Sequence, residues 1–209
     1  MIDGRYVAIL WDITADKPVD RRDFQQISQI KNLCPKGKPA LYYKIHQVVC
    51  LDKQNQDNLE TVRTTFFNNN PEFLPPETVS PDGALWAVGG YNSNHVDVDV
   101  YSIADNNFLD HYQADNSTLF SFQPEYSLAF SPNAALLAVG EDSGKVTVWQ
   151  IKTNQLQYSC DAAFQVKDLA FSPDNQKLAL IDKGHRAIMD LTAPGCTITY
   201  PKTSSEVSN

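Results

Sequence analysis

Tyr126-Ser-Leu-Ala-Phe-Ser-Pro-Asn133 recurs 41 residues later as Lys167-Asp-Leu-Ala-Phe-Ser-Pro-Asp174, and a short apolar run follows each copy. The step Ser80-Pro-Asp-Gly83 is a third copy, and Cys34-Pro-Lys-Gly37 is a degenerate fourth. The four prolines are separated by 46, 51 and 41 residues. Periods of about 20–50 residues are typical of repeat architectures. The chain is therefore predicted to repeat one structural unit about four times.

Each copy predicts the same order of strands. Proline cannot donate to a β-ladder, so an apolar strand ends at Ser-Pro, and Asp-Gly or Asn makes a tight turn into a second strand. A third strand follows, because Val96–Tyr101 and Lys145–Trp149 alternate apolar and polar residues. A shorter fourth run comes next in every copy, at Val62–Phe67, Phe108–Tyr112, Leu156–Tyr158 and Thr197–Tyr200. We expect four antiparallel strands per unit and little helix, with a helical turn competing only at Asp20–Ile30.

These repeats resemble the blades of the WD-repeat β-propeller family, which are four-stranded sheets arranged in a ring. The third strand of that family ends in Trp-Asp. The corresponding pairs here are Trp11-Asp12, Leu51-Asp52, Tyr101-Ser102, Trp149-Gln150 and Met189-Asp190. The turn Asp142-Ser-Gly144 matches the family's Asp-x-Gly turn, whereas the family's Gly-His step before the first strand is missing from every copy. The resemblance implies divergent blades.

The predicted fold is an all-β propeller with about four complete blades and an N-terminal half blade. The half blade covers residues 1–24, because Trp11 precedes Pro35 by 24 residues, as Trp149 precedes Pro173. The blades cover about 25–68, 69–118, 119–161 and 162–200, and 201–209 is a disordered polar tail. Three explanations fit the half blade: the chain is part of a longer propeller with missing N-terminal blades, it pairs with a second copy, or it closes a small irregular ring.

The composition limits which kinds of partner the chain can bind and in which compartment it is expected to work. The chain has 25 acidic and 17 basic residues, and its net charge of −8 disfavours binding to a nucleic-acid backbone. No apolar run approaches the roughly 18 residues that a membrane-spanning helix needs. The four cysteines, at positions 34, 50, 160 and 196, form no CxxC pair, so we expect buried free thiols. Without a signal-peptide pattern, the predicted location is the cytoplasm.

The sequence contains no motif for catalysis. Nucleotide-binding loops, a nucleophile elbow and a zinc-protease helix are all absent. The histidines at 46, 95, 111 and 185 are scattered, and none has a second ligand at metal-binding spacing. Asp97 and Asp99 lie on one side of a strand, where a pair could bind a cation or act as acid and base, although such pairs more often form a polar strand face or pair with a lysine on the neighbouring strand. We therefore predict no catalytic residue, metal site or cofactor.

The resemblance implies a non-catalytic scaffold that binds a protein or peptide partner on one face of the ring. Family members build that face from turns between second and third strands and from the approaches to each first strand. The positions that correspond here are Asn94, His95, Asp142, Asp161, Lys183 and His185. Two alternatives remain open. One is an enzyme or small-ligand-binding propeller that uses the histidines with Asp97 or Asp99, and the other is a truncated remnant of a longer propeller protein.

Overall fold

The computed structural model describes residues 6–12, 17–24, 40–43, 47–50, 52–67, 76–92, 95–115, 126–182 and 184–200. The chain divides into two compact units, one of residues 1–90 and 98–111 and the other of residues 91–97 and 112–209. The predicted tail at 201–209 lies outside the described residues.

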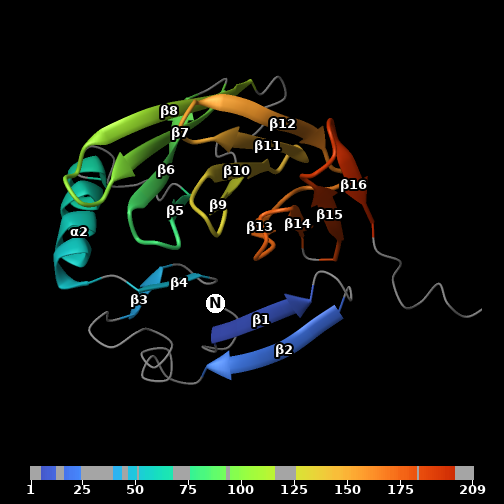
Figure 1. Cartoon of the computed structure of the whole chain (residues 1–209), viewed down its shortest axis with the longest axis horizontal. Helices are drawn as coiled ribbons and strands as arrows, with labels where there is room; N and C mark the ends of the chain where they lie inside the picture. The colour runs from blue at the N-terminus through green and yellow to red at the C-terminus, as the bar shows by residue number, and fades with distance from the viewer. Residues whose placement is uncertain are drawn as a thin grey trace, which may run out of the picture. The chain divides into compact units, whose positions relative to one another are not determined.

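Three four-stranded antiparallel sheets confirm the predicted repeating unit (Figure 1). In each sheet every strand pairs with the next along the chain, so each is a simple meander that we call a blade. The first blade contains β5 (Glu77–Val79), β6 (Leu85–Asn92), β7 (His95–Ser102) and β8 (Phe108–Asp115). The second contains β9 (Tyr126–Phe130), β10 (Leu136–Glu141), β11 (Lys145–Gln150) and β12 (Gln155–Asp161). The third contains β13 (Asp168–Phe171), β14 (Lys177–Ile181), β15 (Arg186–Asp190) and β16 (Thr197–Thr199).

The N-terminal part of the chain departs from the predicted repeat. Strands β1 (Tyr6–Asp12) and β2 (Lys17–Phe24) form a two-stranded sheet, as do β3 (Ala40–Tyr43) and β4 (Gln47–Cys50). Helix α2 (Lys53–Phe67) follows β4. The predicted strand at Val62–Phe67 is therefore wrong, and the described part of residues 25–68 contains two strands and a helix instead of a complete blade.

Local interactions explain why this segment is helical. The Asp52 carboxylate accepts a hydrogen bond from the Asn55 main-chain nitrogen at 2.8 Å and so caps the first turn. Lys53 pairs with Asp57 across one turn. The segment from 53 to 67 contains no glycine or proline to interrupt the helix. These sequence features favour a helix even though Val62 and the phenylalanines are common in strands.

Helix α2 packs on the first blade. Its buried Leu59 and Val62 join a core cluster with Val79, Trp86, Val88 and Ile103. An ion pair reinforces this contact, because Arg63 donates two hydrogen bonds to the Glu77 carboxylate, at 3.1 and 2.9 Å. Trp86 Nε1 donates a third to the same carboxylate at 2.9 Å. The acid is thus satisfied although its side chain is only 8% exposed.

The Ser-Pro turns form the same hydrogen-bond network in all three blades. In the second blade, Ser131 Oγ donates to Asn133 Oδ1 at 2.8 Å and accepts from the Leu136 nitrogen at 2.9 Å. Asn133 Oδ1 also accepts from the Ala135 nitrogen at 3.1 Å. Ser80 with Asp82 and Ser172 with Asp174 repeat these contacts. The repeated motif therefore fixes the hairpin between the first and second strands.

Each of these turns needs one residue in the left-handed conformation. The φ angles are +74° at Gly83, +53° at Ala134 and +61° at Asn175. Glycine and asparagine adopt this region readily, whereas alanine does so at a cost of roughly 1–2 kcal/mol. Ala134 is therefore a strained position in the second blade.

The second and third blades pack face to face through one apolar cluster. The second blade contributes Ala129, Ala138, Val146, Val148 and Cys160, and the third contributes Leu169, Leu178, Leu180, Ala187 and Met189. Gly140 allows the close approach, because a Cβ atom there would lie 2.6 Å from Val166 Cγ1. This interface is the main apolar core of the second unit.

Helix α2 covers the face of the first blade that corresponds to the face of the third blade packed against the second blade. By the repeat offset, Trp86 and Val88 of β6 correspond to Leu178 and Leu180 of β14. In the third blade these positions pack against the preceding blade. In the first blade they pack against α2. The helix therefore covers a blade face that would otherwise contact another sheet.

Tyrosine hydroxyls link consecutive blades. Tyr112 Oη, on β8, donates to the main-chain oxygen of Ile151 at 3.2 Å. Tyr158 Oη, on β12, donates to the corresponding oxygen of Leu191. Each tyrosine thus joins the fourth strand of one blade to the residue that follows the third strand of the next.

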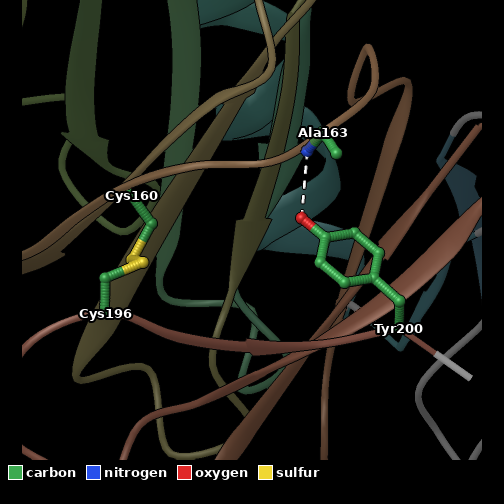
Figure 2. The surroundings of a disulfide bond; sticks show 4 residues. All are labelled: Cys160, Ala163, Cys196 and Tyr200. Carbon is green, nitrogen blue, oxygen red and sulfur yellow. Dashed lines mark hydrogen bonds between the residues drawn. A yellow bond between two sulfur atoms is a disulfide. The ribbon is translucent and has the colours of Figure 1, made fainter.

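The cysteine prediction is wrong for one pair. Cys160, on β12, forms a disulfide with Cys196, which precedes β16, and the two Cα atoms are 5.5 Å apart (Figure 2). At the other end of β16, Tyr200 Oη accepts a hydrogen bond from the Ala163 nitrogen at 3.0 Å. The short edge strand is therefore attached to the second blade at both ends. Cys160 and Cys196 are 36 residues apart, so no local spacing marked them as partners.

Candidate functional site

Three connections meet at one end of the second and third blades. They are the β10–β11 turn at 141–145, the β12–β13 connection at 161–167 and the described residues 182, 184 and 185 between β14 and β15. The Ala162 nitrogen donates to the Gly144 oxygen at 2.8 Å, and the Val166 nitrogen donates to the Glu141 oxygen at 3.0 Å. The Lys167 nitrogen donates to the Ile181 oxygen at 2.9 Å. We call the surface formed by these three segments the turn face.

Gly144 is needed to assemble the turn face. Its φ angle is +91°, and a Cβ atom there would lie 2.7 Å from the Ala162 oxygen and 2.9 Å from the Phe164 oxygen. Only glycine adopts this conformation and tolerates main-chain atoms at such distances. The Asp-x-Gly pattern of the sequence thus lets the β12–β13 connection lie against the β10–β11 turn.

An aromatic cluster occupies the turn face. The Phe164 ring stacks on His185, with centroids 5.5 Å apart and an interplanar angle of 22°. Tyr200 packs edge-on against Phe164 at 6.3 Å. Its hydroxyl accepts the Ala163 hydrogen bond drawn in Figure 2, while 46% of the residue stays exposed. The cluster is partly buried and supported from two blades.

Glu141 is a buried acid beneath this surface. It is 1% exposed, and its Oε2 accepts a hydrogen bond from Ser143 Oγ at 3.0 Å. Burial raises the pKa of Glu141 above its ordinary value, against smaller lowering effects from the Ser143 hydrogen bond and the Lys145 charge. The group therefore favours its protonated form in the folded chain more than in solution.

The structure brings three of the six predicted binding residues to the turn face. Asp142 lies in the β10–β11 turn, Asp161 ends β12 opposite Lys145, and the exposed His185 has its Nδ1 atom 3.6 Å from Asp182 Oδ2. His95 begins β7. Asn94 and Lys183 lie outside the described residues. The binding role of all six stays a prediction.

Sequence reasoning did not select Phe164, Tyr200 and Glu141. Phe164 lies in a connection that has no counterpart in the repeated motif, and Tyr200 follows the last strand. An aromatic residue outside the strand pattern was the available signal for Phe164, whereas Tyr200 was assigned to the predicted fourth strand at 197–200. Glu141 ends an apolar strand, and an acid at that position was a sequence signal. Its burial, however, depends on the β12–β13 connection folding over it.

One of the two acids proposed for an enzymatic alternative pairs with a histidine, whereas the sequence favoured a lysine as the partner. Asp99 Oδ1, on β7, lies 2.7 Å from His111 Nδ1 on the neighbouring strand β8. The main-chain oxygen of Asp97 accepts a hydrogen bond from Tyr126 Oη at 3.4 Å. Both side chains of the Asp99–His111 pair are partly exposed to solvent. Among the described residues, no group of three His, Cys, Asp or Glu side chains is arranged to hold a metal ion.

Comparisons with known proteins support the fold. No family model matches the sequence, and no curated protein matches it. The β-propeller domain of Cps50 (Swd1) from Myceliophteria thermophila matches the structure with a TM-score of 0.51 and 15% identity, over 65% of this chain and 40% of that one. Hydrazine synthase from Kuenenia stuttgartiensis matches with a TM-score of 0.50 and 19% identity, over 61% of this chain and 36% of that one.

At these identities the likeness establishes the fold alone. The matched structure of Cps50 (Swd1) is a β-propeller domain, so the propeller fold predicted from the repeats is confirmed. This chain spans less than half of either protein. No helix in the described part of the chain has the length and apolar character of a membrane span.

Proposed function

We propose that this chain is a non-catalytic, WD-repeat-like scaffold that binds a segment of a protein partner on its turn face. The observation that carries the proposal is the aromatic cluster of Phe164, His185 and Tyr200, presented by connections on a rigid support. Binding residues commonly lie on connections that a scaffold of strands holds in place. The strongest contacts in protein interfaces come from aromatic side chains packed beside polar groups.

The surrounding charges indicate the chemistry of the partner. The turn face has three partly or fully exposed acids, Asp142, Asp161 and Asp182, and two partly exposed lysines, Lys145 and Lys167. The whole chain has a net charge of −8. Complementary charge speeds association and selects among partners. We therefore expect a partner segment that carries positive charge and an apolar or aromatic side chain to contact Phe164.

Peptide selection tests this proposal. A random peptide library is displayed on phage and selected on the purified wild-type chain, and each selected peptide is then titrated against variants. His185→Ala and Asp161→Ala should weaken binding at least tenfold. The matched control is Gln157→Ala, an exposed position on β12, which should leave binding unchanged.

Two results would count against the proposal. One is a library that yields no binding peptide. The other is a set of peptides that lose equal affinity to the control and to the turn-face variants, because their site would then lie elsewhere. Circular dichroism of every variant confirms that the fold is retained.

An enzyme or small-ligand-binding propeller is the alternative, and the Asp99–His111 pair is the observation that favours it. A carboxylate that orients a histidine is one part of many catalytic sites. The pair, however, lies between the third and fourth strands of its sheet and is exposed to solvent. Catalytic groups work best where water is excluded. We therefore favour the scaffold. The third possibility, a remnant of a longer propeller protein, stays a prediction.

The cytoplasmic location also stays a prediction. It rested in part on free cysteines, and the Cys160–Cys196 disulfide removes that premise for this pair. Disulfides persist mainly in oxidising compartments. Thiol labelling of the chain in intact cells, before and after reduction, will show whether this disulfide forms where the protein works.

A further inference from the structure

The two cysteines of the Cys160–Cys196 disulfide differ in their exposure to solvent. Cys160, on β12, is 3% exposed and belongs to the apolar cluster between the second and third blades. Cys196 is exposed and immediately precedes β16. Its neighbour Gly195 is also exposed, and a Cβ atom there would meet no other atom within 4 Å. A thiol in solution can therefore reach the disulfide from the side of Cys196, whereas the core shields Cys160.

Strand β16 has few contacts within its own blade. It contains three residues, whereas the outer strands of the other two blades, β8 and β12, contain eight and seven. Three residue pairs join it to β15. Thr197 and Thr199 are exposed, and Ile198 is partly buried against the apolar cluster. Because every ordered residue costs conformational entropy, we expect this strand to depend on the disulfide for its place in the sheet.

The chain is fixed at the end of β15, ahead of the disulfide. The main-chain nitrogen and Oγ1 of Thr192 both donate to Asp190 Oδ1, at 2.8 and 2.7 Å. The Leu191 nitrogen donates to the Gln176 oxygen at 2.8 Å, and the Leu191 oxygen accepts the hydrogen bond from Tyr158. None of these bonds involves the disulfide. Opening the disulfide should therefore free the chain after Thr192 and leave β15 in place.

The segment that would be freed carries Tyr200 to the turn face. Tyr200 directly follows β16, its hydroxyl accepts the hydrogen bond from the Ala163 nitrogen, and its ring packs edge-on against Phe164. Figure 2 shows this hydrogen bond and the disulfide at the two ends of the segment. Phe164 in turn stacks on His185. The aromatic cluster is therefore complete only while β16 stays paired with β15.

We propose that the Cys160–Cys196 disulfide is a thiol-exchange site for a low-molecular-weight thiol, and that its opening releases β16 and Tyr200. The thiolate of the small thiol attacks Cys196 Sγ, the bond to Cys160 Sγ breaks, and a mixed disulfide forms on Cys196. Cys160 leaves as a thiolate and takes a proton from water, because an apolar core disfavours the charged form.

A second molecule of the small thiol completes the reduction. Its thiolate attacks the sulfur of the first molecule in the mixed disulfide, and Cys196 leaves as a thiolate that takes a proton from water. The products are two protein thiols and one disulfide of the small thiol. Two electrons have then passed from the two small thiols to the protein disulfide, so the reaction balances.

Opening the disulfide should weaken partner binding at the turn face, and this part of the inference rests on the proposed function. Once β16 leaves, Phe164 loses its edge-on neighbour and Ala163 loses its hydrogen-bond acceptor. The oxidised chain is therefore the form that binds a partner tightly. The thiol content of the surroundings sets how much of the chain is in that form.

Treatment with reduced glutathione under native conditions tests the exchange site. The purified oxidised chain is incubated with an excess of reduced glutathione, the reaction is stopped with acid, and the cysteine-containing peptides are mapped by mass spectrometry. Glutathione should be found on Cys196 at least ten times more often than on Cys160. Equal modification of the two residues, or a disulfide that stays closed until denaturant is added, would overturn the proposal.

Hydrogen exchange of the main-chain amides tests the release of β16 without any peptide. After reduction, the amides of residues 193–200 and of Ala163 should exchange at least tenfold faster, whereas those of β10 and β14 should keep their rates. Cys196→Ser should reproduce this result without a reductant, which isolates this disulfide from the other cysteines. The matched control is Thr197→Ser, an exposed neighbour that keeps the disulfide and should behave as the oxidised wild type. Unchanged exchange at 193–200, or equal acceleration in β10 and β14, would overturn the proposal.

Titration of a peptide selected on the oxidised chain separates this inference from the proposed function. The reduced chain and Cys196→Ser should bind the peptide at least fivefold more weakly, and Thr197→Ser should bind it unchanged. Equal affinity for both redox forms, with β16 released, would overturn the control of binding. Faster exchange at 193–200 in a chain that selects no peptide would support the exchange site and count against the proposed function alone.

Discussion

Replacing Gly140 with alanine tests the packing between the second and third blades. The added Cβ atom would lie 2.6 Å from Val166 Cγ1 and 3.2 Å from both Leu169 δ-carbons. Because 2.6 Å is well inside van der Waals contact, Val166 must move within a fully buried core. Forcing one extra carbon into a packed core costs about 1–3 kcal/mol. We expect Gly140→Ala to lower the free energy of unfolding by about 2 kcal/mol.

A double-mutant cycle isolates this contact. Val166→Ala removes the clashing methyl group and should itself cost about 2–3 kcal/mol, from lost burial and the cavity left behind. In that background Gly140→Ala meets only the Leu169 carbons, which lie 3.2 Å away. Its cost should then fall below about 1 kcal/mol, a coupling of at least about 1 kcal/mol.

Urea unfolding of the four chains, followed by tryptophan fluorescence and circular dichroism, measures the cycle. For a chain of this size, 2 kcal/mol corresponds to a fall of about 4–8 °C in melting temperature. The reasoning fails if Gly140→Ala is neutral in the wild type. It also fails if the substitution costs the same with and without the Val166 side chain.

Three further changes follow from the same structure. The double substitution Cys160→Ser and Cys196→Ser removes a crosslink that closes a 36-residue loop. Urea unfolding should show that the free energy of unfolding falls by about 4 kcal/mol. An unchanged unfolding midpoint would contradict the pairing. Ala134→Gly relieves a φ of +53° and should raise stability by about 0.5–1 kcal/mol, whereas the matched Gly83→Ala should lower it. Because burial raises the pKa of Glu141, the contribution of this residue to stability is fully present below its ordinary pKa of 4.5 and is lost as pH rises through the higher folded pKa. Glu141→Gln should therefore stabilise the chain at pH 7.5 and not at pH 3.5, and equal effects at both would be inconsistent with that shift.

The sequence predicted the repeating unit because its signal is local. Ser131 and Asn133 form their hydrogen bonds within a five-residue turn, and Ser172 with Asp174 does the same. Such a turn is encoded wherever the Ser-Pro-Asx pattern occurs. The two strands on either side then follow from apolar alternation.

The helix at 53–67 was missed because repeat spacing was allowed to override local signals. The blade pattern required a strand near Val62, although Asp52 was available as a cap and no glycine or proline follows it before residue 68. Packing against the first blade stabilises the helix, because its apolar side chains bury Trp86 and Val88. The repeat therefore predicted a partner for that face but the wrong kind of element.

Contacts between residues far apart in the chain could not be predicted from the sequence. The Cys160–Cys196 bond and the Phe164–His185 stack join residues of neighbouring blades. These residues come close because of the angle between neighbouring blades. Local sequence patterns do not predict that angle. Asp142, Asp161 and His185 could be placed at one end because all three lie at corresponding ends of strands.

A nuclear magnetic resonance titration tests the central claim most directly. A peptide selected on the wild-type chain is added to isotope-labelled protein, and the shifts of the main-chain amide signals are followed. Binding at the turn face predicts that the largest shifts fall at residues 141–145, 161–167 and 182–185. Shifts centred on Asp99 and His111 would contradict the scaffold account and favour a ligand-binding or catalytic site on β7 and β8.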